Sequence, residues 1–265
     1  MLTTPQRSRS RLGAAYVEHG IGEPVLLIHG VGMRLEAWAP QAEALAASHR
    51  VIVVDMPGHG ESDRLPDDAQ LSDFVTWFGA LLDDLDVERI NVAGHSMGAL
   101  IAGGMAATMG KRIARVGLLN GVYRRSPEAR AAVEARAALI RSGTFDVEAP
   151  LERWFSAADK GSDAYQLTRN CLATVDPQGY ATAYSAFATG DDVYADAWPT
   201  VACPSLFLTG EHDANSSPEM AREMAAAAQN GWARIVRGHR HMVNLTAPSA
   251  VTDHMRAWLS REVET

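Results

Sequence analysis

A serine, an acid and a histidine that could act together in nucleophilic catalysis each follow a predicted strand in this sequence. The serine is Ser96, in the motif Gly94-His95-Ser96-Met97-Gly98. An apolar run, residues 90–93, precedes the motif and a run of small residues follows it, which is the context of a sharp strand-to-helix turn. Such a turn holds the hydroxyl at its apex and requires glycine two positions away on either side. The motif predicts a nucleophile at a helix N-terminus, where unpaired N–H groups and the helix dipole favour an oxyanion.

A serine hydroxyl needs a base to take its proton, and the base needs an acid to orient it. Glu211 and Asp213 follow the apolar run 205–209, and Asp213 is preferred because it lies further beyond the strand end. The alternative role for Asp213 is a turn or helix-capping carboxylate. His239 and His241 both follow the last predicted strand, and spacing alone does not choose between them. Serine, acid, histidine is the chain order expected for a sheet of this type.

A tetrahedral intermediate also needs two hydrogen-bond donors for its oxyanion. The amide of Met97, directly after the serine, is one candidate, and the amide of Val31 in the loop Gly30-Val31-Gly32 is the other. The alternatives for this loop are a simple turn and a phosphate cradle. The phosphate cradle is excluded, because the loop has neither a P-loop lysine nor the G-x-G-x-x-G spacing. Three further histidines stand in glycine-flanked loops and are interpreted as structural: His29, His59 and His95.

Four apolar runs predict buried strands: residues 24–28, 51–55, 90–93 and 116–119. Helical spacing separates them at residues 38–48 and 71–85, and a leading strand or hairpin is predicted within residues 12–19. This alternation indicates an α/β fold with a parallel sheet and helices on both faces. Because ligand sites in such sheets lie beyond the carboxyl ends of the strands, His29, Asp55 and Ser96 are expected on one rim.

The alternation of strands and helices stops between residues 122 and 199. This segment predicts helices at residues 128–141, 149–157, 163–174 and 178–189. Strands return at residues 205–209 and 233–237, with helices at 218–229 and 248–262. We therefore predict a core made of residues 1–121 and 200–265, and an all-helical cap, residues 122–199, that folds as a lid over the rim of the sheet.

Composition limits the kinds of partner. The 265 residues carry a formal net charge of −8, which argues against nucleic acid because that partner requires a basic surface. Neither a signal peptide nor an apolar run of membrane-spanning length is visible, and Cys171 and Cys203 are expected to be free thiols. We predict a cytoplasmic protein that takes a small-molecule substrate and uses no membrane, metal or organic cofactor. The sequence leaves the oligomeric state open.

Five ordered motifs resemble the signatures of the α/β-hydrolase fold superfamily. They span nearly the whole chain and comprise residues 28–32, 55–62, 94–98, 209–213 and 241–245. The resemblance implies Ser96 as nucleophile, Asp213 as acid, and the amides of Val31 and Met97 as oxyanion donors. A serine nucleophile also separates the chain from the haloalkane dehalogenases of the same fold, whose nucleophile is an aspartate.

The same resemblance implies that His241, and not His239, is the base. In the family the catalytic histidine directly precedes a stretch like Met242-Val243-Asn244-Leu245. The chain departs from the family pattern at Thr246, where a glutamate is common. This departure counts against the choice of His241 over His239.

Two segments, residues 151–155 and 173–180, are similar to cap segments of 3-oxoadipate enol-lactonases, which hydrolyse a small lactone bearing a carboxylate. This resemblance implies a carboxylic-ester or lactone hydrolase that works through an acyl-enzyme. A guanidinium could bind the carboxylate of such a substrate, although a cap arginine is more often simply solvated. The candidate substrate-binding residues are Arg34, Arg124, Arg125, Arg153 and Trp154.

Two alternative functions share these residues. The first is a C–C bond hydrolase of ring-cleavage products (vinylogous diketones), which product analysis would distinguish because two carbon fragments would form. The second is a ligand receptor that keeps the fold and the triad but signals through movement of the lid. Negligible turnover across a broad substrate panel would favour the receptor.

Overall fold

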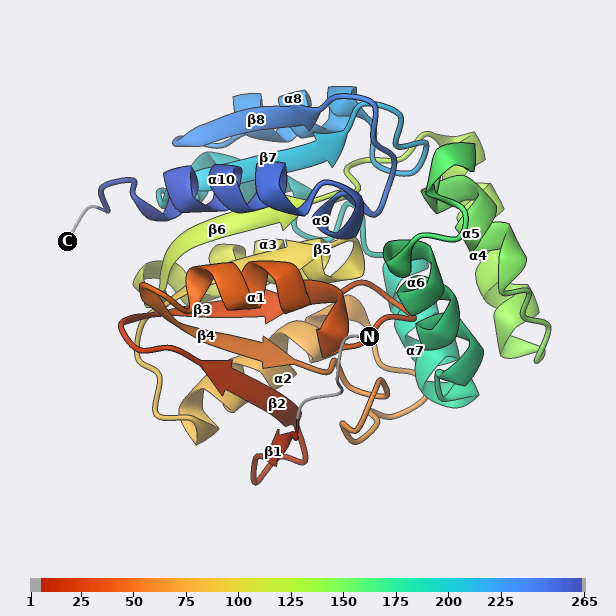
Figure 1. The fold of residues 1–265 in the computed structure, drawn as a ribbon, viewed down its shortest axis with the longest axis horizontal. Coiled ribbons are helices and arrows are strands. Elements are labelled where there is room, and N and C mark those ends of the chain that lie inside the picture. The colour runs from red at the N-terminus through yellow and green to blue at the C-terminus, as the bar shows by residue number, and fades with distance from the viewer. Residues whose placement is uncertain (1–5, 264–265) are drawn as a thin grey trace.

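The strands of the computed structural model, which describes residues 6–263, form one eight-stranded sheet within that range (Figure 1). The strand order is β1-β2-β4-β3-β5-β6-β7-β8. Six strands pair in parallel: β3 (Glu23–Ile28), β4 (His49–Val54), β5 (Ile90–His95), β6 (Ile113–Leu119), β7 (Ser205–Gly210) and β8 (Gly231–Val236). At one edge, β2 (Ala15–His19) pairs antiparallel with both β4 and β1 (Ser8–Arg9). The predicted mostly parallel sheet is confirmed.

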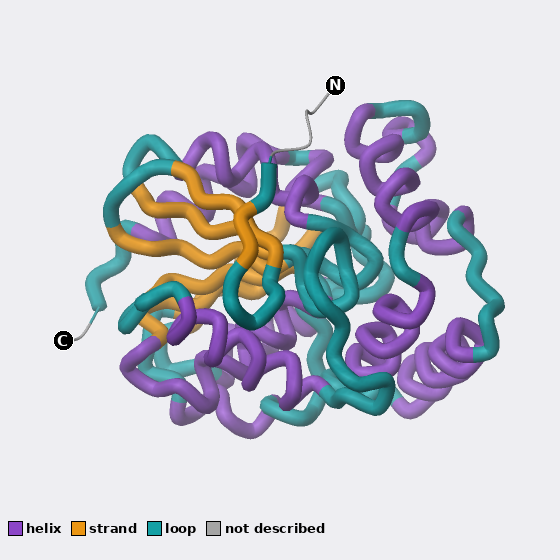
Figure 2. The backbone as a smooth tube through the Cα atoms, turned by 90° about the horizontal axis from the view of Figure 1, so that it is seen from below, coloured by secondary structure: helices purple, strands orange, loops and turns teal. Residues whose placement is uncertain are grey.

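Helices cover both faces of the sheet, which is why its central strands are apolar on both sides. Val25 and Leu27 of β3 pack into a core with helices α1 (Ala39–Leu45) and α10 (Pro248–Leu259). The alternate residues Leu26 and Ile28 pack into the other core, which includes residues of α2 (Leu71–Asp84), α3 (Met97–Met109) and α8 (Pro218–Ala227). Figure 2 shows the strands enclosed between these two helical layers. None of the helices in the described range is long and apolar enough to cross a membrane.

Four helices, called the cap helices below, lie between β6 and β7 in the chain. They are α4 (Pro127–Arg141), α5 (Glu148–Trp154), α6 (Asp163–Thr174) and α7 (Pro177–Ala188). In Figure 1 they gather in green on the side toward which the β7 arrow points, beyond the carboxyl ends of the parallel strands. The division into core and cap at residues 122 and 199 stays a prediction, and the core's ends, residues 1–5 and 264–265, lie outside the described residues.

Side-chain caps explain where several helices begin. The side chains of Ser126, Ser162, Asp176 and Ser217 accept hydrogen bonds from the first turns of α4, α6, α7 and α8. Each satisfies an amide that the helix itself leaves unpaired. The observed cap helices begin and end within a few residues of the predicted ones.

Some elements differ from the sequence prediction. Strand β6 begins at Ile113 because the buried Arg115, which interrupts its apolar pattern, bonds to Glu23 and Asn91. Helix α1 is shorter than predicted because it ends at Leu45, where a turn at residues 46–48 follows, and a 3-10 helix, Leu35–Trp38, precedes it. The short helix α9 (Val243–Thr246) was not predicted.

Candidate active site

Ser96 lies at the apex of a tight turn between β5 and α3. Its backbone has φ 55° and ψ −114°, a strained conformation for a residue with a side chain. A Cβ on Gly94 would lie 1.9 Å from the carbonyl oxygen of Gly98, and a Cβ on Gly98 would lie 2.3 Å from that of Ile28. Both contacts are with backbone, which cannot move aside. The glycines are therefore required sterically, for the reason that the sequence motif predicts.

Asp213 and His241 are buried and in contact. His241 Nδ1 lies 2.8 Å from Asp213 Oδ2, and the same oxygen accepts from Asn120 Nδ2 at 2.8 Å. The other oxygen, Oδ1, accepts from the amide of Asn215 at 2.8 Å. Burial alone would raise the pKa of Asp213, but His241 and these hydrogen bonds outweigh burial and lower that pKa. The carboxylate is thus held ionised against one imidazole nitrogen.

The competing acid and histidine have other partners. Glu211 Oε2 accepts from the amide of Gly238 at 2.8 Å. His239 Nδ1 lies 2.9 Å from the hydroxyl of Thr246, the position where the chain departs from the family pattern. The structure therefore brings Asp213 to His241 and directs Glu211 and His239 elsewhere.

Ser96 and His241 line one cavity of about 220 Å³ beneath the cap helices. Val31 lies on its wall, and Trp154 of α5 lies there with its ring centroid 5.4 Å from that of His241. Three of the cap helices contribute further residues to the wall: Arg136 of α4, Arg153 of α5, and Tyr184 and Phe187 of α7. A third arginine, Arg125, precedes α4 and also lines the cavity. The predicted residues Ser96, His241, Val31, Arg153 and Trp154 thus meet in one place, and Met97 is the buried first residue of α3 beside Ser96.

The loop that carries Val31 is fixed against the serine. A Cβ on Gly30 would lie 3.1 Å from Cβ of Ser96, so the two loops touch. The amide of Gly32 donates to His59 Nε2 at 2.9 Å, and the amide of Leu35 donates to Asp55 Oδ1 at 2.8 Å. Burial lowers the pKa of His59 to about 4, so its ring stays neutral and able to accept near neutral pH.

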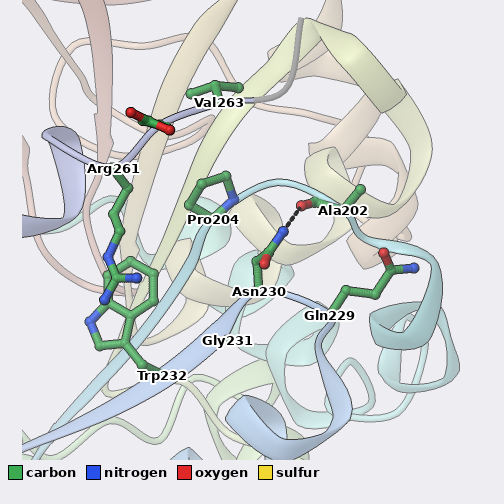
Figure 3. Close-up of a pocket in the computed structure, with 9 residues that line it drawn as sticks. Ala202, Pro204, Gln229, Asn230, Gly231, Trp232, Arg261 and Val263 are labelled. Atoms are coloured by element: carbon green, nitrogen blue, oxygen red, sulfur yellow. Dashed lines mark hydrogen bonds between the residues drawn. The ribbon is translucent and has the colours of Figure 1, made fainter.

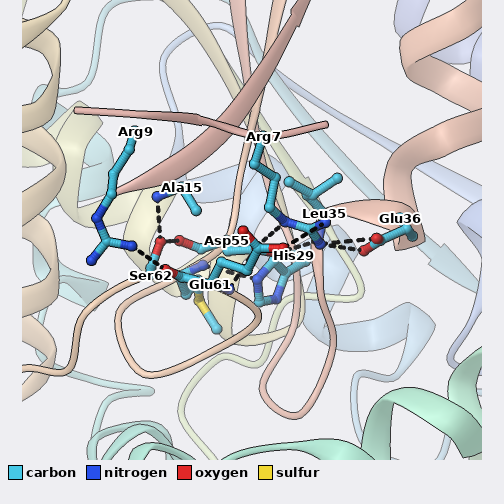
Figure 4. Close-up of polar contacts among 10 residues, drawn as sticks. Arg7, Arg9, Ala15, His29, Leu35, Glu36, Asp55, Glu61 and Ser62 are labelled. Atoms are coloured by element: carbon cyan, nitrogen blue, oxygen red, sulfur yellow. Dashed lines mark hydrogen bonds and ion pairs between the residues drawn. The ribbon is translucent and has the colours of Figure 1, made fainter. Parts of the chain in front are cut away.

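A buried ion-pair network also holds the same loop in place (Figure 4). Arg7 Nε donates to Asp55 Oδ2 at 2.7 Å and Arg7 Nη2 donates to Glu36 Oε1 at 2.9 Å. His29 Nε2 accepts from the amide of Met56 at 2.9 Å. The segment before β1 is thereby tied to the loops that follow β3 and β4.

His95, next to the serine, holds the backbone of the histidine loop. Its Nε2 lies 2.9 Å from the carbonyl oxygen of His241, to which it donates. Burial, followed by the nearby His241, lowers the pKa of His95 to about 3. The contacts of His29, His59 and His95 with backbone atoms fit the structural roles predicted for them.

Two predicted substrate-binding arginines are not brought to the cavity. Arg124 forms an ion pair with Asp196 at the surface, where about half of its side chain is exposed. Arg34 is half-buried and is absent from the cavity wall. Conversely, sequence reasoning missed Arg136 and the donor role of Asn120. Only the position of Asn120 directly after an apolar run could have indicated its place beside the acid.

A larger hollow, about 830 Å³, lies at the opposite end of the sheet (Figure 3). It is formed around Pro204 and Gly231, at the amino ends of β7 and β8, with Arg261 stacked 4.2 Å above the ring of Trp232. Ser96 does not line it. Since ligands of parallel sheets bind at the carboxyl ends of strands, the smaller cavity at Ser96 is the candidate site.

Comparisons with known proteins identify the family. Residues 25–254 match the alpha/beta hydrolase family, and the chain belongs to it. It is 48% identical over 256 residues, 97% of each chain, to the (E)-2-((N-methylformamido)methylene)succinate hydrolase of Acinetobacter baylyi. It is 30% identical over 197 residues, 71% of each chain, to 3-oxoadipate enol-lactonase 1 of the same species.

A solved structure gives the same assignment. A thermophilic esterase from Thermogutta terrifontis, described with malate bound, superposes with a TM-score of 0.87 at 28% identity, covering 96% of this chain and 98% of that one. The predicted fold class, the resemblance to enol-lactonases and the assignment as an enzyme are confirmed. The protein is a hydrolase of the α/β fold.

Proposed function

We propose that this enzyme is a serine hydrolase that cleaves a small, anionic acyl compound through an acyl-enzyme on Ser96. The observation that carries the proposal is the convergence of Ser96 and His241 on one cavity, with Asp213 behind the histidine. This is the arrangement of nucleophile, base and orienting acid that acyl transfer requires.

We propose a role for each group from this geometry. Because Nδ1 of His241 faces Asp213, Nε2 is the nitrogen available to take the proton of Ser96. Oγ of Ser96 attacks the acyl carbon, and the amides of Val31 and Met97 stabilise the oxyanion. His241 then protonates the leaving group, and later removes a proton from the water that hydrolyses the acyl-enzyme.

The chemistry of the cavity wall supports an anionic substrate, since the guanidinium groups of Arg125, Arg136 and Arg153 line it as hydrogen-bond donors. Two of the similar proteins point the same way: one is named for a succinate derivative, and the other is described with malate bound. Both compounds are dicarboxylates. The acyl group that we propose is a carboxylic ester or lactone, as the likeness to enol-lactonase supports.

A second candidate reaction is supported by the 48%-identical relative, whose name describes an N-methylformamido group on a methylenesuccinate. A formyl carbon on nitrogen is also an acyl carbon, so the same residues would release formate and an amine. C–C cleavage of a ring-cleavage product would use the same nucleophile and base. The three reactions differ in their products and not in the residues required.

We also propose that the enzyme works in the reducing environment of the cytoplasm. Cys171 and Cys203 are both free, and burial raises the pKa of each thiol, that of Cys203 to about 11. Unpaired, unreactive thiols are typical of proteins in reducing compartments.

Product analysis tests the proposed reaction. The protein is incubated with a carboxylate-bearing lactone, p-nitrophenyl esters, an N-formyl enamine of a dicarboxylate and a vinylogous diketone. We expect one ring-opened acid from the lactone, and loss of about 10⁴-fold in kcat in Ser96→Ala. Formate release from the N-formyl compound alone would establish the second candidate, and two carbon fragments from the diketone would establish C–C cleavage. A folded protein that turns over none of these compounds would contradict the proposal and favour a receptor.

A further inference from the structure

The three arginines of the cavity differ in what balances their charge. Arg125 is paired: its Nη1 donates to Asp191 Oδ1 at 2.9 Å, and both side chains are buried. Its guanidinium also lies 4.4 Å from the ring of Phe187. A buried pair of this kind is neutral as a unit, so Arg125 adds hydrogen-bond donors to the wall but little net charge.

Arg136 and Arg153 are not paired. Within residues 6–263, neither forms an ion pair with a carboxylate. Arg136 Nη1 donates to the hydroxyl of Tyr184 at 3.0 Å, and Nε of Arg153 is buried without a hydrogen-bond partner. The other arginines of the cap segment are bound to acids, apart from the exposed Arg141.

Two unpaired guanidinium groups therefore face one small cavity. None of the described residues on its wall is an aspartate or a glutamate. Burial, followed by the charge of Arg136, lowers the pKa of Arg153, which indicates that the two cations lie close enough to repel each other. Arginine nevertheless stays protonated in proteins, so the cavity wall carries two guanidinium charges that no ion pair within residues 6–263 balances.

We infer that Arg136 and Arg153 form a carboxylate-binding subsite and that the substrate is a small dicarboxylate. Both side chains are half-buried, and partly burying unpaired cations is costly, so a ligand with two negative charges reduces that cost. The guanidinium groups come from two different helices, α4 and α5, so each can take a separate carboxylate in a bidentate contact. A single anionic group would leave one of the charges unbalanced.

The inference rests on the proposed function in that it treats the bound dicarboxylate as a substrate. The binding itself does not depend on the reaction. The ligand is therefore tested without turnover, by titration calorimetry with succinate, monomethyl succinate and inorganic phosphate. We expect succinate to bind about tenfold or more tightly than its monoester and than phosphate. Equal binding of succinate and the monoester would overturn the inference, and tighter binding of phosphate would make the subsite one for phosphate.

Substitutions locate the subsite. Arg136→Gln and Arg153→Gln should each weaken succinate binding by about tenfold or more and remove the preference over the monoester. Arg141→Gln, on the exposed part of the same helix as Arg136, is the matched control and should leave the Kd unchanged. Unchanged succinate binding in both cavity variants would overturn the inference.

Two further measurements keep the outcomes separate. Circular dichroism establishes whether each variant is folded. If a glutamine variant is unfolded, Arg136→Lys or Arg153→Lys replaces it, since lysine keeps the charge but loses the bidentate geometry. Succinate binding by a protein whose Ser96 proves unreactive would contradict the proposed function and leave the dicarboxylate subsite standing.

Discussion

At the residue scale, the contacts of Asp213 support the role that we propose for the imidazole of His241. One carboxylate oxygen contacts both His241 and Asn120, and the other accepts the amide of Asn215. These contacts keep the acid ionised and hold Nδ1 of the histidine toward it. Nε2 is then the only ring nitrogen that can serve Ser96.

The two histidines of the loop after β8 give a direct test of this assignment. His241→Ala and Asp213→Asn should each lower kcat by about 10⁴-fold, because the first removes the base and the second disturbs its tautomer. His239→Ala should keep kcat within about threefold of wild type, since its ring contacts only the hydroxyl of Thr246 among the hydrogen bonds of the described chain. Initial-rate kinetics with one ester substrate measures all three. Equal losses in the His239 and His241 variants would contradict the assignment.

The proposed catalytic residues follow strand ends, whereas Arg136, which the sequence did not reveal, lies within a cap helix. Ser96, Asp213 and His241 each follow a strand end, so their meeting at one rim follows from the alternation of strands and helices. Arg136 lies in the middle of a cap helix, and its contact with the cavity depends on how α4 is oriented over the sheet. Local spacing carries no information on that orientation, so Arg124 was named from the sequence and Arg136 was not.

At the element scale, the turn between β5 and α3 is tight because α3 starts directly against the neighbouring strand β3. Gly98 lies so close to β3 that a Cβ there would reach the backbone of Ile28. Gly103, one and a half turns further along the same helix, faces only side chains, with Trp198 as the nearest at 3.4 Å. The same substitution at the two positions therefore separates crowding at the turn from helix propensity.

Gly98→Ala should lower the free energy of unfolding by about 1–3 kcal/mol and reduce kcat, because the added methyl group pushes α3 and Ser96 away from β3. Gly103→Ala should be neutral or stabilise by up to about 1 kcal/mol, since alanine favours a helix interior. Urea denaturation and ester kinetics measure the two effects. A Gly98 variant as stable and active as the Gly103 variant would show that the turn tolerates a side chain.

Element positions followed from the sequence wherever apolar patterning was continuous. Strands β3, β4 and β5 are apolar on both faces and were recognised for that reason. The start of β6 was missed, because Arg115 pairs with Glu23 and donates a hydrogen bond to Asn91, both on other strands. Partners this distant in the chain are not visible in a local window.

At the scale of the whole molecule, three neutral histidines are buried around the site. Burial lowers the pKa of His29, His59 and His95, to about 4 for His59 and about 3 for His95. An unfolded histidine titrates near pH 6.5. Between about pH 4 and pH 6.5 the unfolded chain therefore binds more protons than the folded one, so the free energy of unfolding falls as the pH is lowered through this range.

Lowering the pH from 7.0 to 5.5 should thus reduce the free energy of unfolding by about 1 kcal/mol for each of these three histidines. Urea denaturation at the two pH values measures the change. His59→Gln, which cannot gain a proton, should show a smaller loss over the same range. Equal stability of the wild type at both pH values would mean that the three rings are already accessible to protons in the folded state.

The central claim is that Ser96 is an activated nucleophile in a cavity of the α/β hydrolase fold. Intact-protein mass spectrometry after treatment with a serine-directed fluorophosphonate tests it most directly, with Ser96→Ala treated in parallel. The account predicts one added phosphonyl group, mapped to Ser96 by peptide analysis and absent from the variant. An unlabelled, folded wild type, or equal labelling of the wild type and the variant, would contradict it.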